Sequence, residues 1–189
     1  MSQLTQAARF TAICSLFCTA SVFMQAQAPA PPKPAIGTPI APAEVYGKQL
    51  DLMEKEFVSA ADAMPEDKYN FAPTQGEYKG VRTFAEEIKH VIQANEYYFH
   101  DFSRPLTDNR AAIANLKTKA EIMAALKDSF AQAHAFVNAI TPENAFTATA
   151  AGNTRAGQAA FGMAHFMDHY GQMVEYLRMN GIVPPASAK

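Results

Sequence analysis

The chain has 189 residues, of which 18% are charged, and a formal net charge of −2. It contains no strongly basic stretch, so we do not expect nucleic acid as a partner. Its length suits a single domain with a substantial apolar core, with some residues to spare at the termini.

The first 28 residues have the layout of a secretory signal peptide. Arg9 is their only charged side chain, residues 10–24 form an apolar run, and residues 26–28 read Ala-Gln-Ala, which fits the small-x-small cleavage pattern. The apolar run is short for a membrane-spanning helix. We therefore expect residues 1–28 to be removed, the protein to be exported to the periplasm or the extracellular space, and no stable membrane span to remain after cleavage.

Two alternatives remain open for this segment: an uncleaved N-terminal anchor, or cleavage nearer Ala20, because Pro29 is unfavourable directly after a cut. Both cysteines, Cys14 and Cys18, lie within it. Its removal would leave a mature protein with no thiol, which excludes a disulfide or a cysteine nucleophile. The mature net charge would be 15 − 18 = −3, because only Arg9 is lost from the charged residues.

A proline-rich leader follows at residues 29–42, PAPPKPAIGTPIAP. Its composition favours an extended segment over a packed element. Residues 43–185 then make up the expected single domain.

Four amphipathic helices are predicted in this domain, and no segment alternates as a strand would. Thr83 with Glu86, and Thr118 with Glu121, each form a capping box, in which hydroxyl and carboxylate satisfy free backbone N–H groups. The pattern predicts an all-α four-helix bundle. The helices are expected at about Ala43–Ala63, from Thr83 until Pro105 closes the helix, from Thr118 to about Ile140, and at about Arg155–Asn180.

Three histidines are the candidate metal ligands. His165 and His169 are four residues apart on the last helix, so their rings project from one face. His90 lies on the second helix. Three neutral imidazoles with an open fourth position are typical of a catalytic metal site. A lone H-x-x-x-H pair also commonly caps or flanks a core, which is the structural alternative.

The helical periodicity places all three histidines on the flanks of the apolar stripes, where two facing helices could line a cleft open to solvent. Gly162 shares the side of His165 and His169, and we expect it to leave space above them. His100 is expected to be exposed, and His134 to lie at a helix edge, both outside the site.

Other chemistries do not fit the sequence. A di-iron bundle needs two Glu-x-x-His motifs, and residues 87–90 supply one without a second. Phe166 follows His165, so the H-E-x-x-H motif of zinc proteases is absent. No phosphate-binding loop, dinucleotide fingerprint or nucleophile elbow occurs.

Three segments together resemble the DinB-like (YfiT-like) family of proposed metalloenzymes, which are four-helix bundles. Residues 64–91, MPEDKYNFAPTQGEYKGVRTFAEEIKHV, are similar to the family's loop and its histidine-bearing second helix. Residues 165–173, HFMDHYGQM, resemble the family's H-x-x-x-H helix. Residues 176–185, YLRMNGIVPP, resemble the C-terminal segment of Leu-Arg, a glycine and prolines with which family members usually end. The bundle is then expected to be up-down-down-up or a related topology.

The resemblance implies that His90, His165 and His169 bind a divalent metal, most often zinc or nickel. Some relatives are transferases that use a low-molecular-weight thiol. The first hypothesis is therefore an exported metal-dependent hydrolase or transferase acting on an unidentified small molecule. The alternatives are a non-enzymatic metal- or ligand-binding bundle and an interaction domain in which the histidines have no role.

Four side chains are candidates for orienting the metal ligands, because a carboxylate that accepts an imidazole N–H fixes the ring and raises its basicity. They are Glu86, Glu87, Asp168 and Tyr176. The alternative for Glu86 and Asp168 is that they are charges on helix surfaces that are simply solvated. The sequence leaves open whether the protein forms a homodimer.

Overall fold

The computed structural model describes residues 33–100, 102, 106–150 and 152–188. The predicted signal peptide and the first residues of the leader lie outside these ranges. The chain divides into two compact units, Met1–Thr38 and Pro39–Lys189, and the second contains all the helices of the described ranges. No helix in the described part of the chain combines the length and the apolarity needed to cross a membrane.

The fold is all-α, as predicted. Four long helices account for most of the described residues, and the single pairing of extended residues there is an isolated bridge between Ala148 and Thr154. Two short 3-10 turns, Glu66–Lys68 and Pro185–Ser187, complete the structure. The helices are α1 Pro42–Ala63, α2 Phe84–Tyr98, the short α3 Arg110–Ala114, α4 Lys119–Asn138 and α5 Arg155–Met179.

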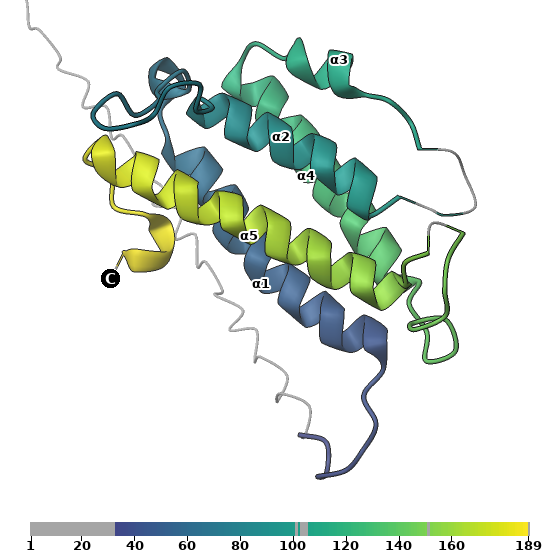
Figure 1. The fold of residues 1–189 in the computed structure, drawn as a ribbon. Coiled ribbons are helices and arrows are strands. Elements are labelled where there is room, and N and C mark those ends of the chain that lie inside the picture. The colour runs from purple at the N-terminus through teal and green to yellow at the C-terminus, as the bar shows by residue number, and fades with distance from the viewer. Residues whose placement is uncertain (1–32, 101, 103–105, 151, 189) are drawn as a thin grey trace, which may run out of the picture. The chain divides into compact units, whose positions relative to one another are not determined.

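The long helices form an up-down-down-up bundle (Figure 1). α1 and α5 run in one direction, and α2 and α4 run in the other. α1 packs against α4 and α5, and α2 packs against the same two helices, so α1 and α2 are diagonal neighbours. α2 and α5 are therefore antiparallel neighbours. The middle of α2 faces the middle of α5, and the start of each helix lies beside the end of the other.

Three phenylalanines from three helices meet at the centre of the core. Phe57 of α1, Phe130 of α4 and Phe166 of α5 are each fully buried, with ring centroids 5.2–6.2 Å apart in tilted or edge-on pairs. Burying one such ring contributes on the order of 2–3 kcal/mol. The bundle therefore rests on apolar contacts that the histidines do not supply.

α2 begins as predicted and ends earlier. The Thr83–Glu86 capping box is formed at its start, but the helix stops at Tyr98, ahead of Pro105. Phe99 and Phe102 continue the apolar period beyond the helix, because both rings pack edge-on against Phe136 of α4. The short helix α3, which the sequence analysis did not predict, lies in the long connection that carries the chain from α2 to the parallel helix α4.

The loop before α2 is fastened to that helix. The backbone N–H groups of Phe84 and Ala85 donate to the carbonyls of Phe71 and Tyr69, at 2.9 and 2.8 Å. The Tyr69 hydroxyl, buried at this end of the bundle, donates to the Ala61 carbonyl of α1 at 2.9 Å. These bonds, together with the capping box, fix where α2 starts and so where its inward-facing residues lie.

Gly162 does not leave open space above the histidines, contrary to the expectation from sequence. A Cβ at this position would lie 2.6 Å from the Phe99 ring and 2.9 Å from Tyr98 Cβ, because the end of α2 crosses α5 here. Glycine is therefore required for the close approach of the two helices. Gly171, nine residues further along α5, has no such neighbouring atom within 4 Å of the corresponding Cβ.

These two glycines give a matched test of the helix crossing. Gly162→Ala should lower the free energy of unfolding by about 1–3 kcal/mol, the usual penalty of overpacking. Gly171→Ala should raise it by about 0.5–1 kcal/mol, because alanine stabilises an open helical position. Urea denaturation measures both. A stabilising Gly162→Ala would contradict the crossing described here.

Candidate metal centre

α2 supplies two inward-facing polar side chains, Glu87 and His90. The capping box sets the first turn of the helix, and residues three apart lie on one face, so Glu87 and His90 point to the same side. Glu87 is buried and His90 is half-buried. α2 thus presents a carboxylate and an imidazole toward α5.

α5 supplies His165 and His169 on successive turns. The helix is continuous through both residues, so the spacing of four places their rings on one side. His165 is half-buried and His169 is 5% exposed. His169 is therefore deeper than its flank position suggested, because α2 packs directly over it.

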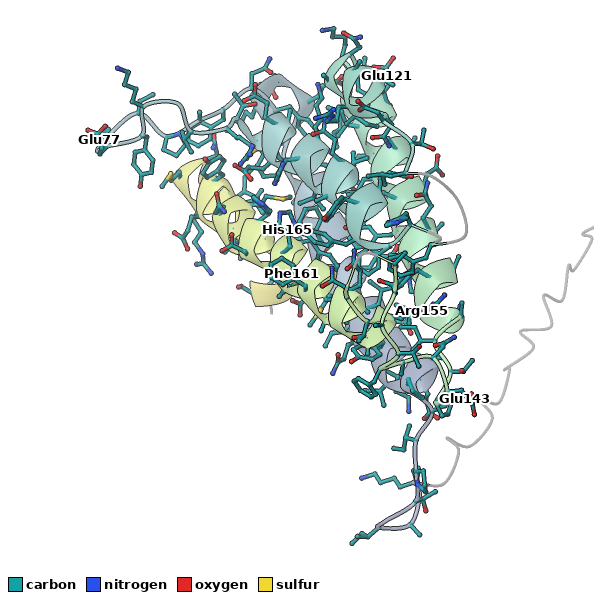
Figure 2. All side chains as sticks on the ribbon, turned by 45° about the vertical axis from the view of Figure 1, so that its right-hand side comes forward. Glu77, Glu121, Glu143, Arg155, Phe161 and His165 are labelled. Atoms are coloured by element: carbon teal, nitrogen blue, oxygen red, sulfur yellow. The ribbon has the colours of Figure 1, made fainter. Side chains whose placement is uncertain are left out.

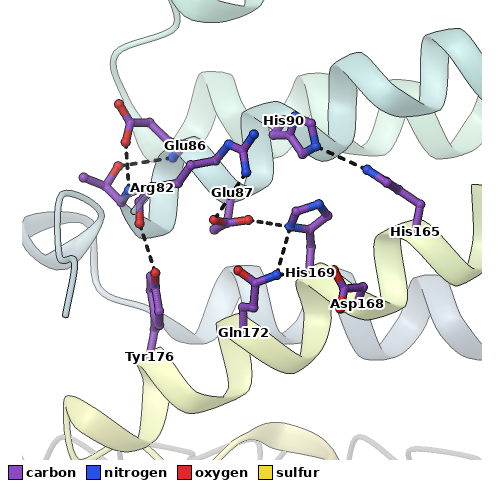
Figure 3. Close-up of polar contacts among 10 residues, drawn as sticks. Arg82, Glu86, Glu87, His90, His165, Asp168, His169, Gln172 and Tyr176 are labelled. Carbon is purple, nitrogen blue, oxygen red and sulfur yellow. Dashed lines mark hydrogen bonds and ion pairs between the residues drawn. The ribbon is translucent and has the colours of Figure 1, made fainter. Parts of the chain in front are cut away.

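The three predicted histidines converge (Figure 3). Nε2 of His90 lies 3.2 Å from Nε2 of His165, and one ligand atom from each of the three rings falls within 4.8 Å of the others. Metal–nitrogen bonds of about 2.0–2.1 Å require nitrogens roughly 3–4 Å apart. The His90–His165 pair already meets this spacing, and a ring nitrogen of His169 lies within 4.8 Å of the other two ligand atoms.

Glu87 fixes the orientation of His169. Its Oε2 lies 2.5 Å from Nδ1 of His169, and the two side chains are 1% and 7% exposed. An ionised carboxylate can only accept, so Nδ1 carries the proton, and in the neutral ring the lone pair is on Nε2. Figure 3 shows this second nitrogen turned toward His90 and His165. This is the arrangement by which a carboxylate sets the tautomer of a metal-binding histidine.

The surroundings of His90 and His165 favour the neutral form of these two imidazoles. Burial, and next the charge of the Arg82 guanidinium, lower the pKa of His90 from 6.5 to about 4. Burial is also the main cause that lowers the pKa of His165. Neutral imidazole is the form that binds metal.

The donor set fits a divalent metal. One ring nitrogen of each histidine faces the common point, where Nε2 of His90 and Nε2 of His165 lie 3.2 Å apart. A cation at the convergence point would satisfy the lone pairs that otherwise face one another. The donors are three nitrogens without a thiolate, a set that suits zinc or nickel.

The other candidate side chains have structural roles. The Glu86 carboxylate accepts from the Thr83 N–H at 2.8 Å in the capping box. The Tyr176 hydroxyl donates to the Arg82 carbonyl at 3.1 Å, which holds the residue before the cap. Asp168 is exposed and accepts a long bond of 3.5 Å from Gln172. Of the four candidates, Glu87 contacts a cluster histidine.

The remaining histidines do not join the cluster. Nδ1 of His100 lies 2.8 Å from the Tyr97 carbonyl just beyond the end of α2, and the residue is half-buried, less exposed than the sequence predicted. His134 on α4 pairs through Nε2 with Glu54 of α1 at 2.6 Å. Neither residue belongs to the group formed by His90, His165 and His169.

Arg82 is the residue of the site that sequence reasoning missed. Its guanidinium lies 4.0 Å from Oε1 of Glu87, and its side chain is 46% exposed. It precedes the helix, so helical periodicity carries no information about it. The capping box was the available signal, because it places the residue before Thr83 beside the first turn of α2.

Comparison with known families agrees with this geometry. Residues 49–173 match the model of the DinB superfamily, and the chain therefore belongs to that superfamily. The match spans most of α1 and includes all three histidines. No curated protein matches the chain.

The lowered pKa of His90 predicts how the metal-free protein responds to acid. The unfolded chain takes up a proton near pH 6.5 and the folded chain only near pH 4, so the free energy of unfolding should fall as pH is lowered between these values. His90→Gln should reduce this decline. Urea denaturation of chelator-treated protein at several pH values measures it. His100→Gln is the control, and an unchanged decline in His90→Gln would contradict the assignment.

Proposed function

We propose that this chain is an exported member of the DinB superfamily that binds one divalent metal, zinc or nickel, through His90, His165 and His169. Its function would be metal-dependent hydrolysis or group transfer on a small molecule. The observation that carries the proposal is the convergence of three ring nitrogens, one of them oriented by the buried Glu87. A histidine that only packs in a core would not need two further ring nitrogens and a buried carboxylate around it.

The chemistry follows from the donor set. Three protein ligands are typical of catalytic sites, which keep further coordination positions open, whereas structural zinc sites use four. A divalent ion bound there would act as a Lewis acid toward a substrate oxygen or thiolate. The protein contributes the fixed ring of His169, the neutral rings of His90 and His165, and the nearby charge of Arg82.

Export favours hydrolysis over thiol-dependent transfer. Low-molecular-weight thiols are kept reduced mainly in the cytoplasm. Removal of residues 1–28 would also take away both cysteines of the chain. A protein working outside the cytoplasm would then have neither a thiol of its own nor a ready supply of one.

One observation favours a second candidate, a non-enzymatic metal- or ligand-binding bundle. Hydrolysis usually employs a carboxylate or imidazole as general base. Glu87, the carboxylate in contact with the described histidine cluster, is already engaged by His169 and lies 4.0 Å from Arg82. Turnover of a model ester or amide by the metal-loaded protein would separate the two candidates.

Metal uptake tests the ligand assignment. His169→Ala should abolish stoichiometric zinc or nickel binding, because two imidazoles leave a much weaker site. Glu87→Gln should keep the ligands but weaken binding by about 10–100-fold, the usual effect of losing a carboxylate that orients a ligand. Metal content after dialysis, and titration against a competing chelator, measure both.

Two variants serve as controls in that series. His100→Ala removes a histidine outside the cluster, and Glu175→Gln removes an exposed carboxylate of α5. Neither should change metal content or affinity. Equal metal content in the wild type and His169→Ala would refute the three-histidine site.

Export has its own test. The protein should be recovered outside the cytoplasm, shortened at its N-terminus and without cysteine, because the signal peptide carries both Cys14 and Cys18. Intact mass spectrometry of the purified protein decides this. An intact Met1 start in a soluble cytoplasmic fraction would overturn the proposed localisation.

A further inference from the structure

The antiparallel packing of α2 and α5 places two kinds of side chain on opposite sides of the histidines. Tyr98, at the end of α2, meets Phe161 near the start of α5. At the other end, Arg82 precedes α2 and its carbonyl meets Tyr176. The histidines lie between an aromatic group and a cation.

The aromatic group reaches the cluster itself. The ring of Tyr98 lies between Phe161 and His165, with centroid distances of 5.4 and 5.3 Å, and Tyr97 adjoins it at 5.1 Å. Phe161 and His165 are on successive turns of α5 (Figure 2). Tyr98, which contacts His165, is half-buried, whereas its two neighbours Phe161 and Tyr97 are 62% and 53% exposed and are open to a bound molecule.

Arg82 is held in place with its charge accessible. Its carbonyl accepts from Tyr176, and Glu87 lies 4.0 Å from its guanidinium. Figure 3 shows the guanidinium on the His90 side of the cluster. A guanidinium has five N–H donors, and with nearly half of the side chain exposed it can engage a carboxylate or phosphonate.

The charge balance also favours an anion. A divalent ion bound by three neutral imidazoles would keep its charge of +2, and Glu87, the buried carboxylate beside it, contributes −1. Arg82 adds a positive charge 4.0 Å from Glu87, whereas the carboxylates of Glu86 and Asp168 are exposed to solvent. An anionic ligand would compensate the remaining positive charge.

We infer that the ligand of this site is a small organic anion that carries an aromatic ring. Its anionic group lies between the metal and Arg82, and its ring packs on Tyr98 and Phe161. The inference rests on the proposed metal centre, to which it adds the chemical class of the substrate.

Calorimetry with three probes tests this on the zinc-loaded mature protein. Phenylphosphonate has both features, methylphosphonate lacks the ring, and benzyl alcohol lacks the charge. Phenylphosphonate should bind about tenfold more tightly than methylphosphonate, in line with the strength of aromatic contacts. Benzyl alcohol should not bind measurably.

Two variants assign the features to residues. Phe161→Ala should abolish most of the preference for the phenyl group and leave methylphosphonate affinity unchanged. Arg82→Gln should weaken both phosphonates by about tenfold or more, because charge-assisted hydrogen bonds are lost. Both side chains are substantially exposed, so the fold should tolerate the changes. Matched controls are Phe146→Ala, 78% exposed, and Arg178→Gln, on the last turn of α5.

The outcomes separate this inference from the metal centre. Zinc content is measured for every protein, and a wild type that holds no zinc would overturn the metal centre and this inference together. With zinc bound, equal affinity of the wild type for the two phosphonates would overturn the proposed contact of the ligand's ring with Tyr98 and Phe161. An unchanged ratio of the two affinities in Phe161→Ala would do the same. Unchanged phosphonate binding in Arg82→Gln would overturn the assignment of the anionic group to Arg82. Equal losses of affinity in Phe146→Ala or Arg178→Gln would overturn the assignment of the ligand to Phe161 and Arg82.

Discussion

The bond between the Glu87 carboxylate and the His169 imidazole is the constraint on which the site depends. Both groups are buried between α2 and α5, where an unpaired carboxylate would cost several kcal/mol. Sliding either helix by one turn would break the bond and leave both groups without a partner. The bond therefore fixes the register of α2 against α5, and with it the meeting of His90 with His165.

Two adjacent glutamates show how the helix start determines the site. Glu86 faces solvent and closes the capping box with Thr83, whereas Glu87 faces inward and accepts from His169. If α2 began one residue later, Glu87 would take the capping position, and the inward position would pass to Ile88, which has no carboxylate. The local rule that starts the helix is thus also the rule that positions the ligand partner, while the core of Phe57, Phe130 and Phe166 provides stability independently.

Much of this could be predicted from the sequence, because the signals were local. The capping boxes gave the starts of α2 and α4, and the spacing of His165 and His169 gave their common face. Signals that depend on packing were misleading: Phe99 and Phe102 extended the apolar period past the end of α2, and Gly162 suggested open space where Tyr98 and Phe99 pack. Arg82 was missed because it precedes the helix, and Glu87 could be distinguished from the other candidates only by the packing of α2 on α5.

The three histidines are not equally constrained, and the difference bears on how the site would work. His169 is buried and oriented by Glu87, whereas His90 and His165 are half-buried and Nδ1 of His165 has no partner among the described residues. A metal site built this way has one rigid ligand, which fixes where an ion sits, and two rings that can adjust to it. Of the two adjustable rings, His90 is near Arg82 and His165 adjoins Tyr98. A ligand would therefore bind on the exposed side of the cluster, while Glu87 and His169 fix the ligand geometry on the buried side.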